Sequence, residues 1–320
     1  SGIKKIPANT VIMSFKLSLG KVAITEKEMY SNEAIMAFID KGVEKISPEY
    51  LYYLLRAKDW SKGTNKAVMG ATLNKATLST IKIQLHEYDN QLEIVNMLNR
   101  VSSSIDFRKQ QLTKLDELIK ARFVEMFGNA ETTSQAQTKR LEECCISISG
   151  GNTPSMQHPE YYGGKIPFIK SGDVKSDHIS VSSLTLTQIA LNETTVKMLP
   201  KGTLIVVIRS AALLKEFRIG ILDVDAVINQ DLKALQTSDD VLPVYLMWAI
   251  KMKSQVLLSR VQTMLTSHIR MEDLLDLKVQ IPHLSLQNQF ANFVAEINKS
   301  KLLAEVFAQS TCILAENRSK

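Results

Sequence analysis

Residue types that often carry chemistry are present in this sequence, but not at the spacings that catalysis requires. The glycine pair Gly150 and Gly151 is not followed by the Gly-Lys-Ser/Thr of a phosphate-binding P-loop. No HExxH metal motif, GxSxG nucleophile elbow or GxGxxG dinucleotide fingerprint occurs. Asp173 and Asp177 lie near one another, but two aspartates in a loop more often cap turns or face solvent. These patterns predict that the chain has no catalytic residues.

Histidine and cysteine are too dispersed to predict a metal site or a disulfide framework. The five histidines lack ligand spacing, which favours surface or structural roles. Of the three cysteines, Cys144 and Cys145 are adjacent and form no CxxC pair. We therefore expect neither a metal ion nor a cofactor. No apolar run approaches the roughly 20 residues of a membrane helix, and the N-terminus lacks a signal-peptide pattern. We expect a cytoplasmic protein with no membrane association.

Composition and charge leave room for several functions. The 320 residues are 45% hydrophobic and 22% charged, which suffices for two domains with cores and argues against disorder. Lysine and arginine number 39 against 33 acidic residues, so the net charge is +6, with most of the excess in residues 1–90. A charge of this size favours an acidic partner only slightly over an ordinary solvated surface.

The most informative feature is an internal repeat with an offset of about 193 to 198 residues. Each copy has a proline-containing turn, an apolar strand that ends in a basic residue, and a second strand opened by a basic residue. A helix with proline in its first turn and then a long helix follow. The matching segments are 6–12 with 199–205, 21–24 with 218–221, 32–33 with 229–230, 48–51 with 243–246, 81–85 with 277–281, and 90–91 with 288–289. Because the order of elements is the same, we expect the two copies to fold alike.

The long helix of each copy carries apolar residues at helical spacing. Between Gln91 and Phe127 there is neither proline nor glycine, and Gly128 supplies a stop signal. Apolar residues recur there three and four positions apart, which is typical of a coiled-coil seam. The second helix, from Gln287 to about Leu314, has an apolar side of its own. We expect the two helices to pair with each other.

Residues 139–198 have no counterpart ahead of Ile6. This segment alternates turn formers with short aromatic and β-branched stretches, which predicts a loop-rich β region. The first copy is therefore expected to begin partway through its domain.

The order of these motifs resembles that of the specificity subunits of type I restriction–modification systems. The matching segments are Gly-Gly-Asn-Thr-Pro-Ser (150–155), Tyr-Tyr-Gly-Gly (161–164), Ile-Pro-Phe-Ile and Ser-Gly-Asp-Val (within 166–174), Leu-Pro-Lys-Gly-Thr (199–203), Ile-Asn-Gln-Asp-Leu-Lys-Ala-Leu (228–235) and Ile-Pro-His-Leu-Ser-Leu-Gln-Asn-Gln (281–289). With the first copy, the resemblance extends over 6–127 and 141–315. By the arithmetic of the repeat, we expect this chain to lack the front of the first recognition domain, about sixty residues, in which it departs from the family.

The resemblance implies an α+β fold with two mixed α/β target-recognition domains, the first incomplete, separated by long antiparallel coiled-coil helices. The implied parts are a partial first target-recognition domain (1–90), a spacer helix (91–127), a second target-recognition domain (128–286) and a second helix (287–320). Such a subunit recognises a bipartite site in double-stranded DNA. It is not an enzyme itself, and it directs methylation and cleavage by two modification (methyltransferase) subunits and by restriction (translocase and nuclease) subunits.

For DNA contacts we favour basic and amide side chains at strand ends and in loops, because arginine and lysine bind both phosphates and guanine edges. These candidates are Lys16, Lys21, Asn74, Lys75, Lys170, Ser171, Arg209, Lys215, Arg218, His268 and Arg270. For His268 and Arg270, which precede a helix, and for their first-copy counterparts Asn74 and Lys75, the alternative is helix capping. For each of the other candidates a solvated loop residue is the alternative interpretation.

A second class of function also fits the long helices. A non-DNA scaffold or adaptor would use them to organise partner proteins. That function predicts no binding to duplex DNA, or binding that is insensitive to salt, whereas a DNA-recognition subunit loses affinity steeply as salt increases.

Overall fold

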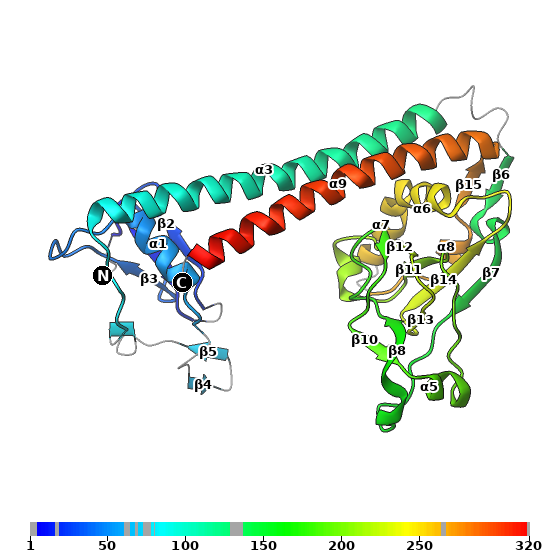
Figure 1. Ribbon diagram of the computed structural model, residues 1–320, viewed down its shortest axis with the longest axis horizontal. Helices are drawn as coiled ribbons and strands as arrows, with labels where there is room; N and C mark the ends of the chain where they lie inside the picture. Colours follow the sequence, from blue (N-terminus) through cyan, green and yellow to red (C-terminus); the bar gives the residue numbers. More distant parts are fainter. Residues whose placement is uncertain are drawn as a thin grey trace. The chain divides into compact units, whose positions relative to one another are not determined.

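The computed structural model describes residues 5–16, 19–60, 65–67, 70–72, 78–79, 81–128, 137–263 and 267–318 (Figure 1). The chain divides into two compact units. Unit 1 comprises residues 1–110 with 305–320, and unit 2 comprises residues 111–304. Both units combine helices with β-sheet, as the sequence predicts for an α+β protein.

Unit 1 is built from short strands and one short helix beside the start of a long one. Its elements are β1 (Val11–Ser14), β2 (Val22–Ile24), β3 (Ile35–Phe38), α1 (Pro48–Ala57), β4 (Asn65–Ala67), β5 (Gly70–Thr72) and the first part of α3 (Tyr88–Phe127). Strands β2, β1 and β3 form an antiparallel sheet in that order, and β4 pairs with β5.

Helix α1 begins as the sequence predicts, with Pro48 in its first turn. The hydroxyl of Ser47 caps the helix by accepting the N–H of Tyr50 at 3.3 Å. The buried core of unit 1 consists of Val11, Met13, Leu55 and Trp60. Helix and sheet therefore bury one small shared core.

Unit 2 contains most of the regular structure. Its elements are β6 (Gln137–Arg140), β7 (Cys145–Gly150), β8 (Tyr162–Ile169), β9 (His178–Ile179), β10 (Leu184–Leu186), α5 (Gln188–Glu193), β11 (Leu204–Val207), β12 (Ile219–Leu222), β13 (Val227–Ile228), β14 (Leu232–Thr237), α6 (Pro243–Met252), α7 (Ser254–Thr263), α8 (Met271–Leu275), β15 (Lys278–Ile281) and the first part of α9 (Leu284–Arg318). Three 3-10 helices complete it: η1 (Leu141–Cys144), η2 (Pro159–Tyr161) and η3 (Ala211–Leu214).

The strands of unit 2 form three sheets. A five-stranded sheet has the order β7-β14-β11-β12-β9, a three-stranded sheet the order β10-β8-β13, and β15 pairs with β6. In the five-stranded sheet only β9 and β12 run parallel. Strands β7 to β10 lie in the segment that the sequence predicts to be a loop-rich β region, and that prediction is confirmed.

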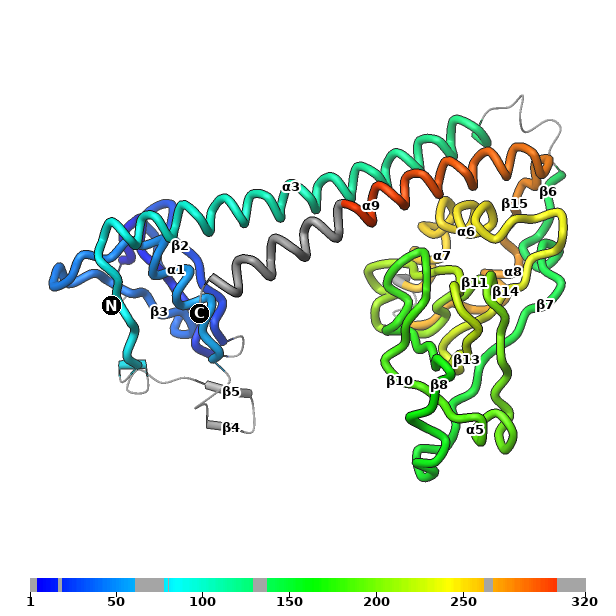
Figure 2. The backbone as a smooth tube through the Cα atoms, viewed as in Figure 1, coloured from blue at the N-terminus to red at the C-terminus, as the bar shows by residue number. Residues whose placement is uncertain are grey.

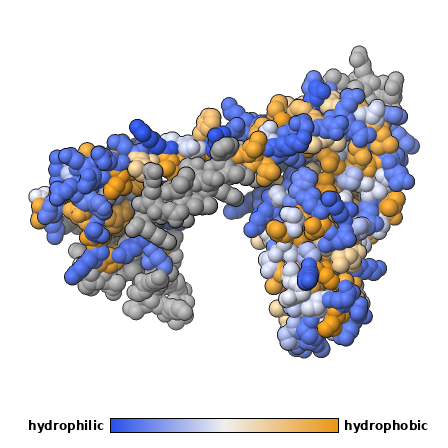
Figure 3. All heavy atoms as spheres, viewed as in Figure 1, coloured by the Kyte–Doolittle hydropathy of each residue, from blue (hydrophilic) through white to orange (hydrophobic). Residues whose placement is uncertain are grey.

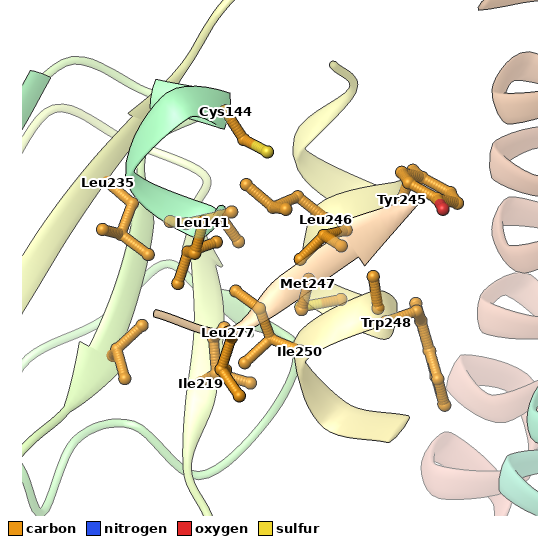
Figure 4. Close-up of a cluster of buried hydrophobic side chains, with 14 of the residues drawn as sticks. Leu141, Cys144, Ile219, Leu235, Tyr245, Leu246, Met247, Trp248, Ile250 and Leu277 are labelled. Carbon is orange, nitrogen blue, oxygen red and sulfur yellow. The ribbon is translucent and has the colours of Figure 1, made fainter. Parts of the chain in front are cut away.

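Helix α6 supplies much of the core of unit 2 (Figure 4). Its residues from Tyr245 to Ile250 are all buried, because the helix is covered on every side. Leu246 and Ile250 belong to the same buried cluster as Leu141 of η1 and Leu235 of β14. Helix α6 therefore shares its core with the five-stranded sheet and with η1, the segment that leads into β7.

A buried glutamine in the first turn of α9 ties this helix to the chain before α6. The side chain of Gln287 is 0% exposed. Its Oε1 accepts the N–H of Leu242 at 2.8 Å, and its Nε2 donates to the carbonyls of Asp240 at 2.9 Å and Pro282 at 2.8 Å. One amide group thus satisfies three backbone groups from two segments.

Gln91 makes the same set of bonds at the start of α3. It too is 0% exposed. Its Oε1 accepts the N–H of Ser47 at 2.9 Å, and its Nε2 donates to the carbonyls of Lys45 at 3.1 Å and His86 at 2.9 Å. The two copies of the sequence repeat therefore also share this set of hydrogen bonds.

The sequence predicts that the long helices begin at Gln91 and Gln287. In the structure each helix begins three residues earlier, at Tyr88 and Leu284. The reason is that each buried glutamine lies inside the first turn and bonds back to a carbonyl that precedes the helix. The sequences 81–85 and 277–281 also differ in structure, since only the second contains a strand. That strand, β15, is paired with β6, which lies in a part of the chain that has no counterpart in the first copy.

Within unit 2 the two long helices pack antiparallel, as expected. Phe123 of α3 lies against Phe290 of α9 with 5.3 Å between ring centroids. Farther from the sheets, Lys301 Nζ of α9 lies 2.5 Å from Asp116 Oδ1 of α3. The residue numbers therefore fall along one helix as they rise along the other, and Figure 2 follows both helices side by side through this unit.

In the part of the chain that the structure describes, no helix combines the length and the apolar character that crossing a membrane needs. On the face drawn in Figure 3, hydrophilic and hydrophobic residues are interspersed over unit 2.

We predict that Gln287→Ala lowers the free energy of unfolding of unit 2 by about 2–4 kcal/mol, because three buried backbone groups lose their partner. In a Trp60→Phe background, the fluorescence of Trp248 during urea unfolding reports on unit 2 alone. The control is Gln289→Ala, on the exposed side of the same helix, which we expect to change stability by less than about 0.5 kcal/mol. Equal stabilities of the two variants would contradict this role of Gln287.

Candidate functional site

One end of the five-stranded sheet collects loops from distant parts of the sequence. Gly150 at the end of β7 faces Lys233 at the start of β14. Val207 at the end of β11 faces Leu232, and Ile219 at the start of β12 faces the same end of β11. Because these strands are antiparallel, the loops that follow β7 and β11 and the loops that precede β12 and β14 lie at the same end of the sheet. We call these strand ends, with their loops, the loop end of the sheet.

Arg209 and His268 lie opposite each other at the loop end. They form an isolated antiparallel bridge, which is supported by a 2.9 Å bond from the N–H of Ser210 to the carbonyl of Ser267. The side chain of Arg209 is 63% exposed, with its Nη1 3.8 Å from Oδ1 of Asp231. Two candidates that are far apart in the sequence are thus neighbours.

Asp231 is held in place by a turn. Nδ2 of Asn229 donates to Oδ2 of Asp231 at 2.9 Å, and Oδ1 of Asn229 accepts the backbone N–H of Asp231 at 3.3 Å. The carbonyl of Asp231 in turn accepts the N–H groups of Ile208 and Arg209. The position of Asp231 near Arg209 therefore follows from a turn that the sequence Asn-Gln-Asp encodes.

Lys215 and Arg218 follow η3 in the same loop. Lys215 is exposed and forms no ion pair among the residues described. Arg218 is 26% exposed and binds the carboxylate of Glu216 through Nε at 2.7 Å and also through Nη2. Of these two predicted cations, Lys215 carries the less compensated charge.

Lys170 and Ser171 lie beside the turn at Asn229. The carbonyl of Ile169 accepts the N–H of Asn229 at 3.1 Å, where the parallel strands β8 and β13 end together. The loop itself is closed by Asp173, whose Oδ2 accepts the N–H of Lys170 at 2.9 Å. Both residues remain partly exposed.

Arg270 shares a carboxylate with an arginine that the sequence did not single out. Asp273 accepts Nε of Arg270 at 2.9 Å and Nη2 at 3.2 Å, and also binds Nη1 of Arg260 in α7. These hydrogen bonds from Arg270 lower the pKa of Asp273 and raise the pKa of Arg270. Arg270 occupies the N-cap position of α8 but makes no side-chain cap bond, so capping does not explain it.

Gly151 at the loop end permits a close approach between two backbone segments. A Cβ atom on Gly151 would lie 2.0 Å from the carbonyl oxygen of Ile228, so glycine lets the segment after β7 pass against the turn at Asn229. A Cβ atom on Gly150 would lie 2.8 Å from Nζ of Lys233, the end of a flexible side chain that can move aside. Lys233, like Arg260, is a basic residue of this end that sequence reasoning missed, because nothing in its strand pattern marks it.

The first copy is described only in part at the equivalent place. Lys16 follows β1 with its Nζ 5.8 Å from the ring centroid of Phe15, and Lys21 precedes β2. Asn32 forms the same turn as Asn229, accepting the N–H of Ala34 at 3.0 Å, and the carbonyl of Ala34 accepts the N–H of Phe15. Alanine thus stands where the second copy has Asp231.

The candidates Asn74 and Lys75 lie outside the described residues. Among the residues that the structure does describe, no group of three histidine, cysteine or acidic side chains is placed to hold a metal ion. Burial raises the pKa of the Cys144 thiol to about 11 and that of Cys145 to about 12, which disfavours the reactive thiolate.

The comparisons with known proteins assign the family. The family model described as type I restriction modification DNA specificity domain matches residues 2–117 and 133–306. Because the match covers most of the chain, the protein belongs to this family.

Individual relatives agree with that assignment. The chain is 26% identical over 239 residues to the type I restriction enzyme MjaIX specificity subunit of Methanocaldococcus jannaschii, covering 68% of this chain and 54% of that protein. It is 25% identical over 148 residues to the EcoR124I/EcoR124II specificity subunit of Escherichia coli, covering 45% and 37%. The chain therefore spans about half or less of the length of these curated relatives.

Solved structures share the fold. The type I restriction–modification S subunit from M. genitalium matches with a TM-score of 0.55 at 13% identity, covering 98% of this chain and 82% of that one. A structure concerned with complex assembly and conformational transition of the type I R-M system matches with the same TM-score at 16% identity, covering 99% and 80%. The α+β fold with a long helix between two domains is thereby confirmed.

We predict that Asp273 stabilises unit 2 at neutral pH and that this contribution is lost in acid. Its pKa in the folded state lies below the ordinary value of 3.8, so the folded state binds the proton less readily than the unfolded state. The contribution is present above the unfolded pKa and disappears as pH falls through the folded pKa, roughly between pH 5 and 2.

The measurement is urea unfolding of Asp273→Asn and of the unchanged chain over this range of pH. The difference in stability between them should shrink as pH falls. Glu272→Gln, which removes the neighbouring carboxylate, is the control and should retain the contribution of Asp273. A difference that stays constant with pH would contradict the prediction.

Proposed function

We propose that this chain is the DNA-recognition part of a type I restriction–modification complex. The observation that carries the proposal is the gathering of Lys170, Arg209, Lys215, Arg218, His268 and Arg270 around the loop end of one sheet. Exposed arginine and lysine side chains on a rigid scaffold suit the phosphates and base edges of duplex DNA. The relatives named as specificity subunits support the same function.

The parts of the chain then take the following roles. Residues 128–286 read one half of a bipartite DNA site, and residues 1–90 belong to the domain that reads the other half. The helices at 91–127 and 287–320 hold the two apart. Lys16, Lys21, Asn74 and Lys75 are the proposed DNA contacts of the first domain, and Ser171 is a further contact of the second.

Within the loop end we assign different tasks to different cations. Arg209 is exposed and oriented by Asp231, which suits it to reading a guanine edge. Lys215 and Lys170 lack a carboxylate on their ammonium groups in the described structure, and these compact charges suit phosphates. Arg218, bound to Glu216, either reads a base or supports the loop.

Catalysis is proposed to reside in partner subunits. Two modification subunits would methylate the DNA and restriction subunits would translocate and cleave it, with the present chain directing them to the site. We place this assembly in the cytoplasm. The scaffold alternative, in which the long helices organise proteins without DNA, is favoured only by those helices, which the DNA-recognition function uses as well.

The first test of this function is salt dependence. With modification subunits present, affinity for duplex DNA should fall by roughly 10³-fold or more between about 50 and 200 mM salt, because phosphate contacts release counterions. Titration of fluorescent DNA at several salt concentrations gives the slope. Binding that is absent, or that is flat across this range, would support the scaffold instead.

A second test separates base reading from phosphate binding at Arg209. Replacement by alanine should cost about 1–3 kcal/mol of binding free energy and relax the preference at one position of the half-site. Lys299→Ala, an exposed lysine on α9 away from the loops, is the control. The measurement is binding to a library of site variants. An equal loss for all sequences would make Arg209 a phosphate contact, and no loss would make it a solvated residue.

A further inference from the structure

Two arginines, one in α7 and one just before α8, converge on one largely buried carboxylate in unit 2. Arg260 of α7 and Arg270 before α8 both bind Asp273, and both donate to the same oxygen, Oδ1. Asp273 is 11% exposed, whereas the two arginine side chains are 51% and 49% exposed. The carboxylate is therefore inside and the two cations face solvent.

Arg270 alone engages both oxygens of Asp273 with Nε and Nη2, which is a complete bidentate pair. Arg260 adds a second guanidinium group to the same carboxylate, so the two arginines carry one more positive charge than Asp273 neutralises. It also brings two like charges to one oxygen atom. An anion bound by both guanidinium groups would relieve that repulsion.

The pair lies next to the loop end of the sheet. Arg270 is two residues from His268, which forms the backbone bridge to Arg209. A small hollow beside the pair is lined by Leu257, Arg260, Val261, His268, Ile269, Arg270 and Asp273. Its apolar members come from α7 and the segment before α8. The two exposed arginines thus line a small hollow that also includes His268, the residue that forms the backbone bridge to Arg209.

We propose that Arg260 and Arg270, positioned by Asp273, bind one phosphate group of the DNA backbone. The inference rests on the proposed function and assigns it a phosphate site that does not read sequence. A backbone phosphate fits because the two guanidinium groups are about half exposed, beside a hollow that is too small to hold a nucleotide. Arginine is suited to it because the planar guanidinium matches two phosphate oxygens. Asp273 is a positioning residue that leaves part of each guanidinium free to donate.

A positioning role for Asp273 and a simple effect of net charge predict opposite changes in the affinity for DNA, so one variant distinguishes them. Asp273→Asn removes a negative charge near the DNA but also releases both arginines. Positioning predicts that affinity falls, by about tenfold, while bulk charge predicts that it rises. Glu272→Gln is the matched control, because Glu272 is exposed, is adjacent in sequence and forms no ion pair among the described residues. It should leave affinity unchanged or slightly higher.

The arginines themselves are tested by the salt slope. Arg260→Ala should weaken binding about tenfold for a target duplex and a random duplex alike, and lower the slope of log affinity against log salt by about one. Arg260→Lys should keep the slope and recover part of the affinity. All variants are measured as the full chain with its modification subunits, after their thermal melting shows an intact fold.

Two results would overturn the inference. If Arg260→Ala binds DNA with unchanged affinity and slope while the parent complex binds in a salt-dependent way, the pair is structural and only this site falls. If Asp273→Asn binds more tightly, as Glu272→Gln does, Asp273 has no positioning role. Failure of the parent complex to bind DNA at all would instead overturn the proposed function together with this site.

Discussion

A single buried amide at the start of each long helix is the contact on which the two copies depend. A helix that must bury its first turn leaves backbone groups without partners, both its own and those of the chain that approaches it. Gln287 satisfies carbonyls before α9 and an N–H group before α6 with one side chain. Gln91 does the same for α3 and α1. These bonds tie the first turn of each long helix to the backbone that precedes α6 or α1.

In unit 2 the same junction is completed by aromatic packing. Phe123 and Phe127 of α3 contact Tyr245 of α6 and Phe290 of α9, with ring centroids between 4.8 and 5.8 Å apart within this group. The five-stranded sheet and the helix pair therefore share one close-packed core through α6.

Three arginines at the loop end are each paired with a carboxylate. Arg209 has Asp231, Arg218 has Glu216, and Arg270 has Asp273. A carboxylate restrains an arginine in one orientation and so lowers the entropy lost on binding. A DNA-binding surface does not need a large excess of basic residues if the ones it has are well placed.

The sequence by itself was enough for the repeat, the α+β class, the first-turn prolines and the family. These features depend on local periodicity and on the order of motifs, which a linear chain displays directly. It did not predict that Arg209 and His268 are neighbours, that Gly151 permits a close approach, or that Arg260 joins Arg270. Each of these is a contact between strands or helices distant in sequence. The register of the sheet and the packing of α7 against η3 bring such residues together. Antiparallel pairing places the ends of separate strands at the same end of the sheet, and this depends on the tertiary structure.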